Sequence, residues 1–367
     1  MPQIKHIEIR ACRADAADPV LAATLPGGST PDFLVVTLRT HEGLMGTSFG
    51  FGGLNAVATG AVLSTVKPFF LGRDPFDRER NWQEFRKFNR KWNHVPIYAY
   101  GPYDNACWDI VGKQAGLPVY KLLGPARDRV PTYASSMFLP DTAAYAAEAL
   151  SVMQAGFHGY KLHPPGTFTE DLAAYRAVRE AVGRDFALMA DPVAAYRLDE
   201  ALRVGRVLEQ LNYLWFEEPL WDEDFRGLRT LAQSLDIPIA ATETLAGQQY
   251  ASAHYAAEGA VDIIRTDVSW RGGITAVMRT AHVAEALGLR CELHTCIYHA
   301  LEIVNLHCAL AISNAEFFEV LYPMSDYDFG LKTPLRIEDG YIYPPEGPGL
   351  GIDYDWDYID DHTVEIY

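Results

Sequence analysis

Three stretches of the sequence decide the fold: FALMAD (186–191), YLWFEEP (213–219) and IPIAATET (237–244). Each is a short apolar run that ends in or just before an acidic residue, and an amphipathic segment separates it from the next. Such alternation is typical of parallel βα units. The carboxylates Asp191, Glu217 and Glu243 therefore recur at the ends of three consecutive predicted strands, 26 residues apart each time.

Five further apolar runs extend this pattern on both sides: VPTYASSMF (130–138), GFHGYKLH (156–163), VDIIRTDVS (261–269), LRCELHTC (289–296) and FFEVL (317–321). Eight βα units close into a barrel more readily than they form an open sheet. We therefore predict an α/β fold with a modified (β/α)8, TIM-like barrel over residues 126–321. Barrel active sites lie at the C-terminal ends of the strands, where the polar residues of these runs cluster.

The two ends of the chain show a different pattern of predicted secondary structure. The N-terminal part reads as three strands followed by mostly helical segments up to about residue 123. The tail, with LRIEDGYIYPPEGPGLGI (335–352), returns to short strands and turns. We predict an α+β capping domain built from residues 1–125 and completed by residues 322–367. The 367 residues suit a barrel of about 250 residues with a smaller companion.

Composition restricts the partners of the chain. A net charge of −17 disfavours binding to nucleic acid or to an acidic lipid surface. The first thirty residues lack a signal-peptide pattern, and no run of about 18 apolar residues occurs, so we predict a cytoplasmic protein without membrane contact. Five cysteines without a C-x-x-C pair suit reduced thiols. Cys291 and Cys296 flank His294, but we interpret them as barrel packing.

The three recurring carboxylates predict a metal site. Three acidic side chains at one barrel mouth repel one another unless a cation lies among them, and an all-oxygen set suits Mg²⁺. Any one of them alone would more commonly be a surface acid or a helix cap, but the regular recurrence favours metal binding. Glu218 directly follows Glu217, and neighbours in a strand face opposite sides, so only one of the two can face the metal. We assign Glu217 as the ligand because it lies 26 residues from both Asp191 and Glu243.

Acid–base candidates follow at the other strand ends. Asp267 and His294 end two consecutive predicted strands, and a carboxylate beside an imidazole fixes its tautomer and strengthens it as a base. Lys161 and His163 alternate in YKLH, so both can face the barrel mouth. A merely solvated lysine is disfavoured in a packed barrel. Glu319 adds a further carboxylate, for which a salt bridge at the rim is the alternative.

These residues resemble the pattern of the enolase superfamily, and within it the mandelate racemase subgroup, over nearly the whole chain. The resemblance implies metal ligands at Asp191, Glu217 in FEEP and Glu243 in TETLAG, a dyad of His294 and Asp267, and a strand-eight carboxylate at Glu319. One departure matters. Many members carry Lys-x-Lys at the end of strand two, whereas Lys161-Leu162-His163 places an imidazole where the second lysine would act as base.

The resemblance implies an enzyme that binds one Mg²⁺ per subunit and removes the proton next to a substrate carboxylate. The metal and Lys161 would stabilise the resulting enediolate. We expect His163 and His294 to complete the dehydration of an aldonic or aldaric acid to a 2-keto-3-deoxy acid. The same residues would serve a racemase or epimerase of a 2-hydroxy acid, or a sugar-lactone cycloisomerase. A non-catalytic metal-binding barrel and a metal-dependent aldolase are the alternatives from other classes.

Substrate contacts are less well defined by the sequence. We predict that Tyr133, Ser135 and Arg271 bind a polyhydroxylated small carboxylate substrate. The loops at 16–31 and 49–55 would close over the barrel mouth and set specificity, as the resemblance implies. The resemblance also implies a homo-oligomer.

Overall fold

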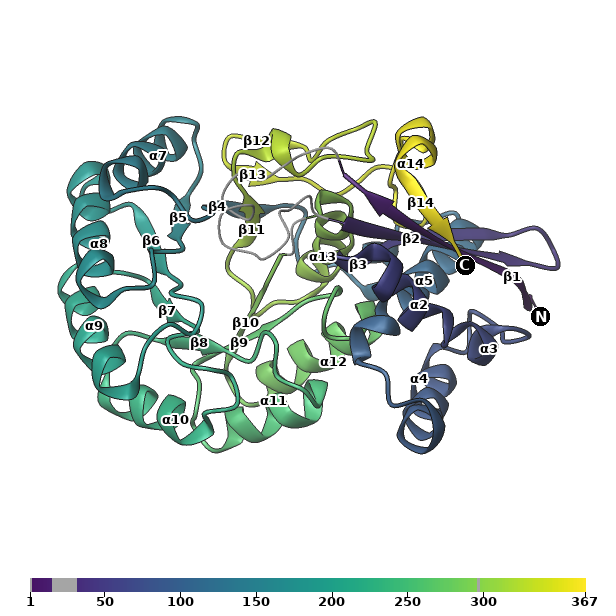
Figure 1. Ribbon diagram of the computed structural model, residues 1–367, viewed down its shortest axis with the longest axis horizontal. Helices are drawn as coiled ribbons and strands as arrows, with labels where there is room; N and C mark the ends of the chain where they lie inside the picture. Colours follow the sequence, from purple (N-terminus) through teal and green to yellow (C-terminus); the bar gives the residue numbers. More distant parts are fainter. Residues whose placement is uncertain (1, 15–31, 296–297) are drawn as a thin grey trace.

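The capping part is built on an antiparallel sheet. The computed structural model describes residues 2–14, 32–295 and 298–367, and Figure 1 shows the capping part on one side of the barrel. Its sheet has the strand order β14-β1-β2-β3, formed by Thr363–Ile366, Ile4–Arg13, Asp32–Thr40 and Met45–Gly53. The C-terminal strand β14 thus pairs with the N-terminal strand β1, as the strand-and-turn texture of the tail predicted.

Helices cover one face of this sheet and connect it to the barrel. They are α2 (Ala56–Ser64), α3 (Lys67–Phe70), α4 (Arg78–Phe88), α5 (Gly101–Ala115) and α6 (Val119–Leu123), with short turns η1 (Asn89–Asn93) and η2 (Ile97–Ala99). Helix α5 packs against β2 and β3. Gly46 permits this approach, because a Cβ atom there would lie 2.1 Å from the carbonyl oxygen of Ala106.

The barrel consists of eight parallel strands. They are β4 (Val130–Ser135), β5 (Gly159–Leu162), β6 (Ala187–Ala190), β7 (Trp215–Glu217), β8 (Ile239–Ala241), β9 (Ile263–Thr266), β10 (Arg290–Leu293) and β11 (Phe318–Leu321). Each pairs with the next from β4 to β10, and β11 pairs with β4. Strands β10 and β11 lie in contact and close the ring. The predicted α/β barrel with a capping sheet is confirmed.

Helices follow the strands around the outside of the ring, as Figure 1 shows. They are α7 (Thr142–Gln154), α8 (Phe168–Val182), α9 (Leu198–Gln210), α10 (Phe225–Ser234), α11 (Gln248–Ala257), α12 (Gly273–Ala286) and α13 (His299–Ala311). Side chains of α5 cap α12: Asp104 accepts hydrogen bonds from Thr275, and Asn105 accepts one from the Ile274 N–H. The N–H groups at a helix start lack partners within the helix, so these bonds fix the capping part on the barrel.

After β11 the tail packs on both parts of the molecule. The turn η3 (Met324–Asp326) leads to β12 (Ile337–Glu338) and β13 (Tyr341–Ile342), and β13 pairs antiparallel with the start of β4. Phe329 and Tyr354 pack against Phe33 and Phe49 of the capping sheet, and after α14 (Trp356–His362) the strand β14 joins that sheet. The boundaries predicted at residues 125 and 321 stay a prediction.

Apolar side chains fill the inside of the barrel below the strand ends. Tyr133, Met189, Trp215, Ala240 and Ile263 form this inner cluster, while a larger core lies between the strands and the outer helices. The described cysteines at positions 12, 107, 291 and 308 are buried free thiols, and Cys296 lies outside the described residues. Within the described part of the chain, every helix is too short or too polar to cross a membrane.

Candidate active site

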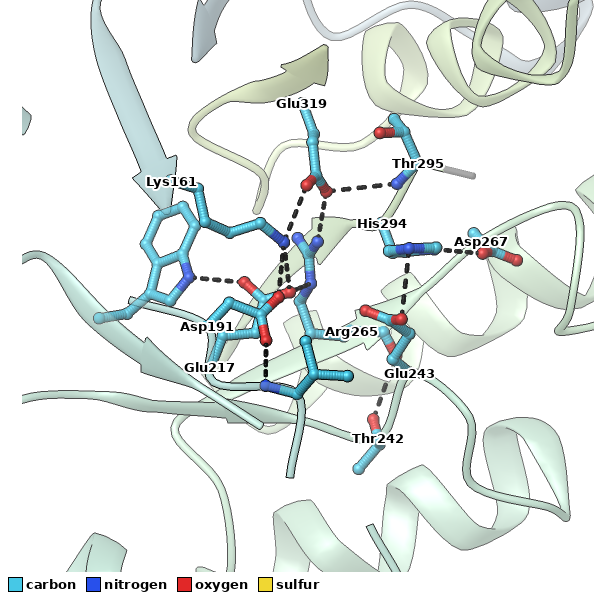
Figure 2. Close-up of polar contacts among 12 residues, drawn as sticks. Lys161, Asp191, Glu217, Thr242, Glu243, Arg265, Asp267, His294, Thr295 and Glu319 are labelled. Carbon is cyan, nitrogen blue, oxygen red and sulfur yellow. Dashed lines mark hydrogen bonds and ion pairs between the residues drawn. The ribbon is translucent and has the colours of Figure 1, made fainter. Parts of the chain in front are cut away.

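The acidic and basic residues singled out in the sequence meet at the C-terminal ends of the barrel strands. Glu217 ends β7, Asp191 directly follows β6, and Glu243 comes two residues after β8. Asp267 directly follows β9, and His294 directly follows β10. Because parallel strands all end at one rim of the barrel, residues far apart in the sequence converge there, as Figure 2 shows.

Lys161 lies at the centre of this group. Its Nζ atom is 3.0 Å from Asp191 Oδ2, 2.9 Å from Glu217 Oε1 and 2.8 Å from Glu319 Oε1. Burial alone would lower the pKa of Lys161, but the three carboxylates raise it well above its usual value. Burial would likewise raise the pKa of Asp191 and of Glu319, but the charge of Lys161 lowers both well below their usual range. The ammonium and these two carboxylates are therefore charged.

Arg265 is a second buried cation, which the sequence analysis missed. It lies on β9, is fully buried, and forms ion pairs of 2.8 Å with Glu217 Oε1 and 2.6 Å with Glu319 Oε2. A signal was present in the sequence: Arg265 stands two residues before Asp267 in the run VDIIRTDVS (261–269), hence on the same face of the strand. Glu319 is consequently paired inside the barrel and forms no salt bridge at the rim.

Both acids of the FEEP motif are buried. Glu217 Oε2 accepts a hydrogen bond of 2.8 Å from the Trp215 indole N–H, while Lys161 and Arg265 contact Oε1. Glu218 follows with a φ of 38°. Burial and then the charges of Glu243, Asp222 and Asp191 raise the pKa of Glu218 well above its usual value. Lys161 and Arg265 therefore compensate the negative charge of Glu217, whereas Glu218 is surrounded by other acidic side chains.

Glu243 combines burial with an unsatisfied oxygen. Its Oε1 lies 3.2 Å from His294 Nε2, and its buried Oε2 has no hydrogen-bond partner among the described residues. Burial and the charge of Glu217 raise the pKa of Glu243 well above its usual value. A buried carboxylate without a partner is unfavourable unless it is protonated or meets a cation.

The donor set fits a hard divalent cation by its chemistry. In the part of the chain that the structure describes, no three acidic, imidazole or thiol side chains stand at the spacing of a preformed metal site, because Lys161 Nζ lies among the carboxylates. Asp191, Glu217 and Glu243 nevertheless offer carboxylate oxygens from three adjacent strand ends. The unpartnered oxygen of Glu243 and the crowding of charge around it are conditions that Mg²⁺ would relieve.

His294 and Asp267 form the predicted dyad. His294 Nδ1 lies 2.5 Å from Asp267 Oδ2, and Asp267 Oδ1 accepts a hydrogen bond of 2.6 Å from the Trp270 N–H. The Trp270 indole stacks on the imidazole, with ring centroids 4.8 Å apart. The carboxylate thus fixes the orientation of the ring through Nδ1, while Nε2 lies 3.2 Å from Glu243 Oε1 at the barrel mouth.

The ring of His163 is also held through Nδ1, but by a backbone carbonyl group in place of a carboxylate. Its Nδ1 lies 2.6 Å from the carbonyl oxygen of Ser136, which can only accept, so Nδ1 carries the proton. Its Nε2 lies 3.0 Å from Asp191 Oδ2. Both histidines line a cavity of about 170 Å³, together with Phe51, Met137, Trp270, Thr295, Glu319 and Leu321. The imidazoles of His163 and His294, which directly follow β5 and β10, therefore line one cavity, and the Nε2 atom of each lies beside a carboxylate of the site.

The three residues predicted to bind substrate do not line this cavity. Tyr133 packs inside the barrel against Trp215, and Ser135 is fully buried at the end of β4. Arg271 is buried and donates a hydrogen bond of 3.0 Å to Ser252 on α11. Contact of these side chains with substrate stays a prediction. Of the two loops predicted to set specificity, 49–55 lies mostly in strand β3 and contributes Phe51, whereas 16–31 lies outside the described residues.

A barrel with a capping sheet and an acidic site at its strand ends defines a class of enzymes, and comparison with known families identifies it. Residues 7–124 match the model of the mandelate racemase / muconate lactonizing enzyme N-terminal domain. Residues 144–358 match the model described as enolase C-terminal domain-like. The chain belongs to the mandelate racemase / muconate lactonizing enzyme group of the enolase superfamily.

Several relatives are named for reactions of sugar acids. Arabinonate dehydratase of Saccharolobus solfataricus is 31% identical over 329 residues, which cover 87% of each chain. D-Galactarolactone cycloisomerase of Agrobacterium fabrum is 28% identical and covers 89% of this chain and 90% of its own. A crystal structure of D-glucarate dehydratase from Agrobacterium tumefaciens complexed with magnesium superimposes with a TM-score of 0.89, at 33% identity and 99% coverage of both chains.

Proposed function

We propose that this enzyme abstracts the proton next to the carboxylate of an acid sugar and eliminates the neighbouring hydroxyl group, giving a 2-keto-3-deoxy acid. One observation carries the proposal: His163 and His294 line the same cavity, each with Nδ1 held by a fixed acceptor, and the Lys161 ammonium is buried in contact with Glu319, another residue of that cavity. Two imidazoles and an ammonium are the groups that proton transfer next to a carboxylate requires.

Asp191, Glu217 and Glu243 would hold Mg²⁺. When bound, Mg²⁺ neutralises charge on the substrate carboxylate and so acidifies the adjacent C–H bond. The magnesium in the related D-glucarate dehydratase structure supports this assignment. Lys161 adds a fixed positive charge that opposes the negative charge building up on the carboxylate as the proton leaves. The ion pairs of Lys161 keep its ammonium in place without reorganisation.

The histidines move the protons. A neutral Nε2 accepts the proton from C2, and the electrons of the C–H bond form a C2–C3 double bond while the C3–O bond breaks. The leaving hydroxide takes a proton from an imidazolium and departs as water, and the enol product tautomerises to the 2-keto acid. If the proton and the hydroxyl leave from the same face, one histidine performs both transfers. If they leave from opposite faces, His163 and His294 share them.

The same geometry supports a second reaction. A histidine on each side of one cavity also suits racemisation or epimerisation, in which the second imidazole returns a proton to the opposite face of C2. Internal loss of a β-oxygen from a lactone uses the same residues, and the related D-galactarolactone cycloisomerase supports keeping that reaction as an alternative. All of these reactions begin with proton abstraction, and they differ in the fate of the intermediate.

One experiment separates the alternatives. The enzyme is incubated with Mg²⁺ in D₂O and a panel of aldonic, aldaric and mandelate-like acids, and 2-keto acid formation is read together with deuterium incorporation at C2. Keto acid from one member establishes dehydration and identifies the substrate. Exchange or inversion without keto acid moves the assignment to a racemase or epimerase. If neither signal appears, dehydration is overturned, and sugar lactones are tested next.

A further inference from the structure

A second cavity, of about 300 Å³, adjoins the catalytic cavity and shares Phe51 and Trp270 with it. Its other lining residues are Pro96, Ile97, Tyr98, Thr244, Leu245, Ala246 and Gln248. The catalytic cavity alone, at about 170 Å³, is smaller than ordinary ligand pockets of about 300–1,000 Å³. A sugar acid whose C2 lies at the two histidines would therefore extend its far end into the second cavity.

An aromatic wall connects the two cavities. The Phe51 ring packs edge-on against Trp270, with centroids 5.7 Å apart, and against Tyr98, with centroids 5.9 Å apart. Trp270 in turn stacks on the imidazole of His294. Ile97 and Leu245 add aliphatic surface to the second cavity. Aromatic and aliphatic walls favour the C–H faces of a ligand and offer nothing to a charged group.

Neither cavity offers a cation to the far end of a substrate. No lysine or arginine is among the described residues that line them. Lys161 and Arg265 are held in ion pairs with acids of the site, and Arg271, which follows Trp270, is buried, donates a hydrogen bond to Ser252 and lines neither cavity. The stretches 15–31 and 296–297 contain no lysine or arginine in their sequence either. A second carboxylate would lose its hydration in the second cavity without gaining a partner.

We infer that the substrate is a monocarboxylate whose far end is uncharged and partly apolar. Among sugar acids these features favour aldonates, and above all aldonates with a methyl group in place of the terminal hydroxymethyl group, over the dicarboxylic aldarates. This inference rests on the proposed function, because it takes the end of the substrate whose C2 lies at the histidine pair as the reacting end. It chooses between the aldonic and aldaric classes that the catalytic residues leave open.

A matched series of acids tests the inference. For each configuration at C2–C5, the 6-deoxyaldonate, the aldonate and the aldarate differ only at C6. Binding to the Mg²⁺-loaded enzyme is measured by isothermal titration, and kcat/KM by the release of the C2 proton. The 6-deoxyaldonate or the aldonate should exceed the matched aldarate by at least about 100-fold, the size of discrimination expected when a polar or charged group is left unpaired. Equal or better use of the aldarate overturns the inference.

The two proposals fail in different ways. If the aldonates bind but none exchanges its C2 proton, the proposed function fails, while the binding order still decides the inference. If none of the acids binds, both are overturned. A change at Gln248, which lines the second cavity only, gives an independent reading. Gln248→Arg places a cation in that cavity and should shift the aldarate-to-aldonate ratio of kcat/KM toward the aldarate by at least about tenfold.

Gln248→Met is the matched control, because it has a similar length and no charge. It should leave the ratio near that of the wild type. Both variants keep a side chain at the same backbone position, where φ is 49°, and circular dichroism and the melting temperature check that each is folded. A folded Gln248→Arg variant with an unchanged ratio overturns the placement of the far end of the substrate in the second cavity.

Discussion

Arg265 Nε lies 2.8 Å from Glu217 Oε1, so a fully buried guanidinium contacts the same oxygen as Lys161. The carboxylate assigned to Mg²⁺ is therefore already compensated by two cations of the chain itself. This relationship makes the stability of the metal-free enzyme depend on Arg265, and it sets the guanidinium in competition with the metal.

Replacing this arginine should lower the free energy of unfolding more in the metal-free enzyme than in the metal-bound one. Arg265→Met leaves Glu217 and Glu319 with one cation fewer in a buried site, and the loss should reach about 3–5 kcal/mol without Mg²⁺. Saturating Mg²⁺ should recover much of it, because the variant lacks the competing guanidinium and should bind Mg²⁺ more tightly than the wild type, and tighter binding stabilises the folded state more. Urea unfolding with and without Mg²⁺ measures both values.

The control for this comparison is Arg179→Met. Arg179 is also largely buried, but it donates its hydrogen bonds to backbone carbonyl oxygens, those of Leu211 and Asn212 among them, away from the site. The decrease in the free energy of unfolding caused by Arg179→Met should be the same with and without Mg²⁺. An Arg265→Met variant that behaves like this control would contradict the competition between guanidinium and metal.

Glu243→Gln should weaken Mg²⁺ binding and activity together. Removal of a metal ligand should lower the affinity at least as much as loss of a supporting contact does, which is about 10–100-fold. Isothermal titration of the variant with Mg²⁺ gives the affinity. Glu292→Gln is a suitable control: Glu292 is buried on β10 but accepts hydrogen bonds from the backbone of Glu316 and Phe317. Full Mg²⁺ affinity in Glu243→Gln would remove Glu243 from the ligand set.

His294→Asn should abolish turnover and leave Mg²⁺ bound. Loss of a general acid or base lowers the rate by about 10²–10⁴-fold. The informative comparison is with His163→Asn, because each variant keeps one imidazole. If the histidines act on opposite faces of C2, one variant should still exchange the C2 proton in D₂O without forming product, and NMR detects this. Normal turnover by either variant would exclude that histidine from proton transfer.

Asp104 predicts a pH-dependent contribution to stability at the contact between α5 and α12. Burial raises its pKa from 3.8 to about 6. An acid whose pKa is higher in the folded state destabilises the fold as it ionises, so the penalty is absent below pH 3.8 and complete above pH 6. It amounts to roughly 3 kcal/mol. Asp104→Asn should remove this part of the pH dependence between about pH 4 and pH 8, and chemical unfolding at both values tests it. An identical slope in variant and wild type would contradict it.

Much of the fold could be predicted because the barrel strands are recognisable in the sequence by their apolar composition. Every apolar run from 130 to 321 became a barrel strand, since a strand covered on both faces is rich in apolar residues, with few charged residues inside it such as Arg265. The same logic located Asp191, Glu217 and His294, which stand where the apolar runs end. The path of the tail was harder, because β12 and β13 contain only two residues each and carry no periodic signal.

The parts of the site that the sequence did not predict depend on contacts between distant segments. Arg265 lies within a strand, and its value as a partner of Glu217 and Glu319 follows only from the closure of the barrel. The second cavity is formed by β3, the turn η2, the segment before α11 with the first residue of that helix, and the start of the loop after β9. No local pattern links these segments, so the apolar character of the cavity had no signal in the sequence.

Trp270 carries out two tasks at once: its indole stacks on His294, and it lines both cavities. Its backbone N–H also holds Asp267. A substitution that reshapes the pocket here would disturb the imidazole at the same time. New substrate preferences are therefore more accessible to evolution through Ile97, Leu245 and Gln248, which line the second cavity only. Trp270 is thus the residue at which the catalytic histidine adjoins the part of the pocket that can change without loss of catalysis.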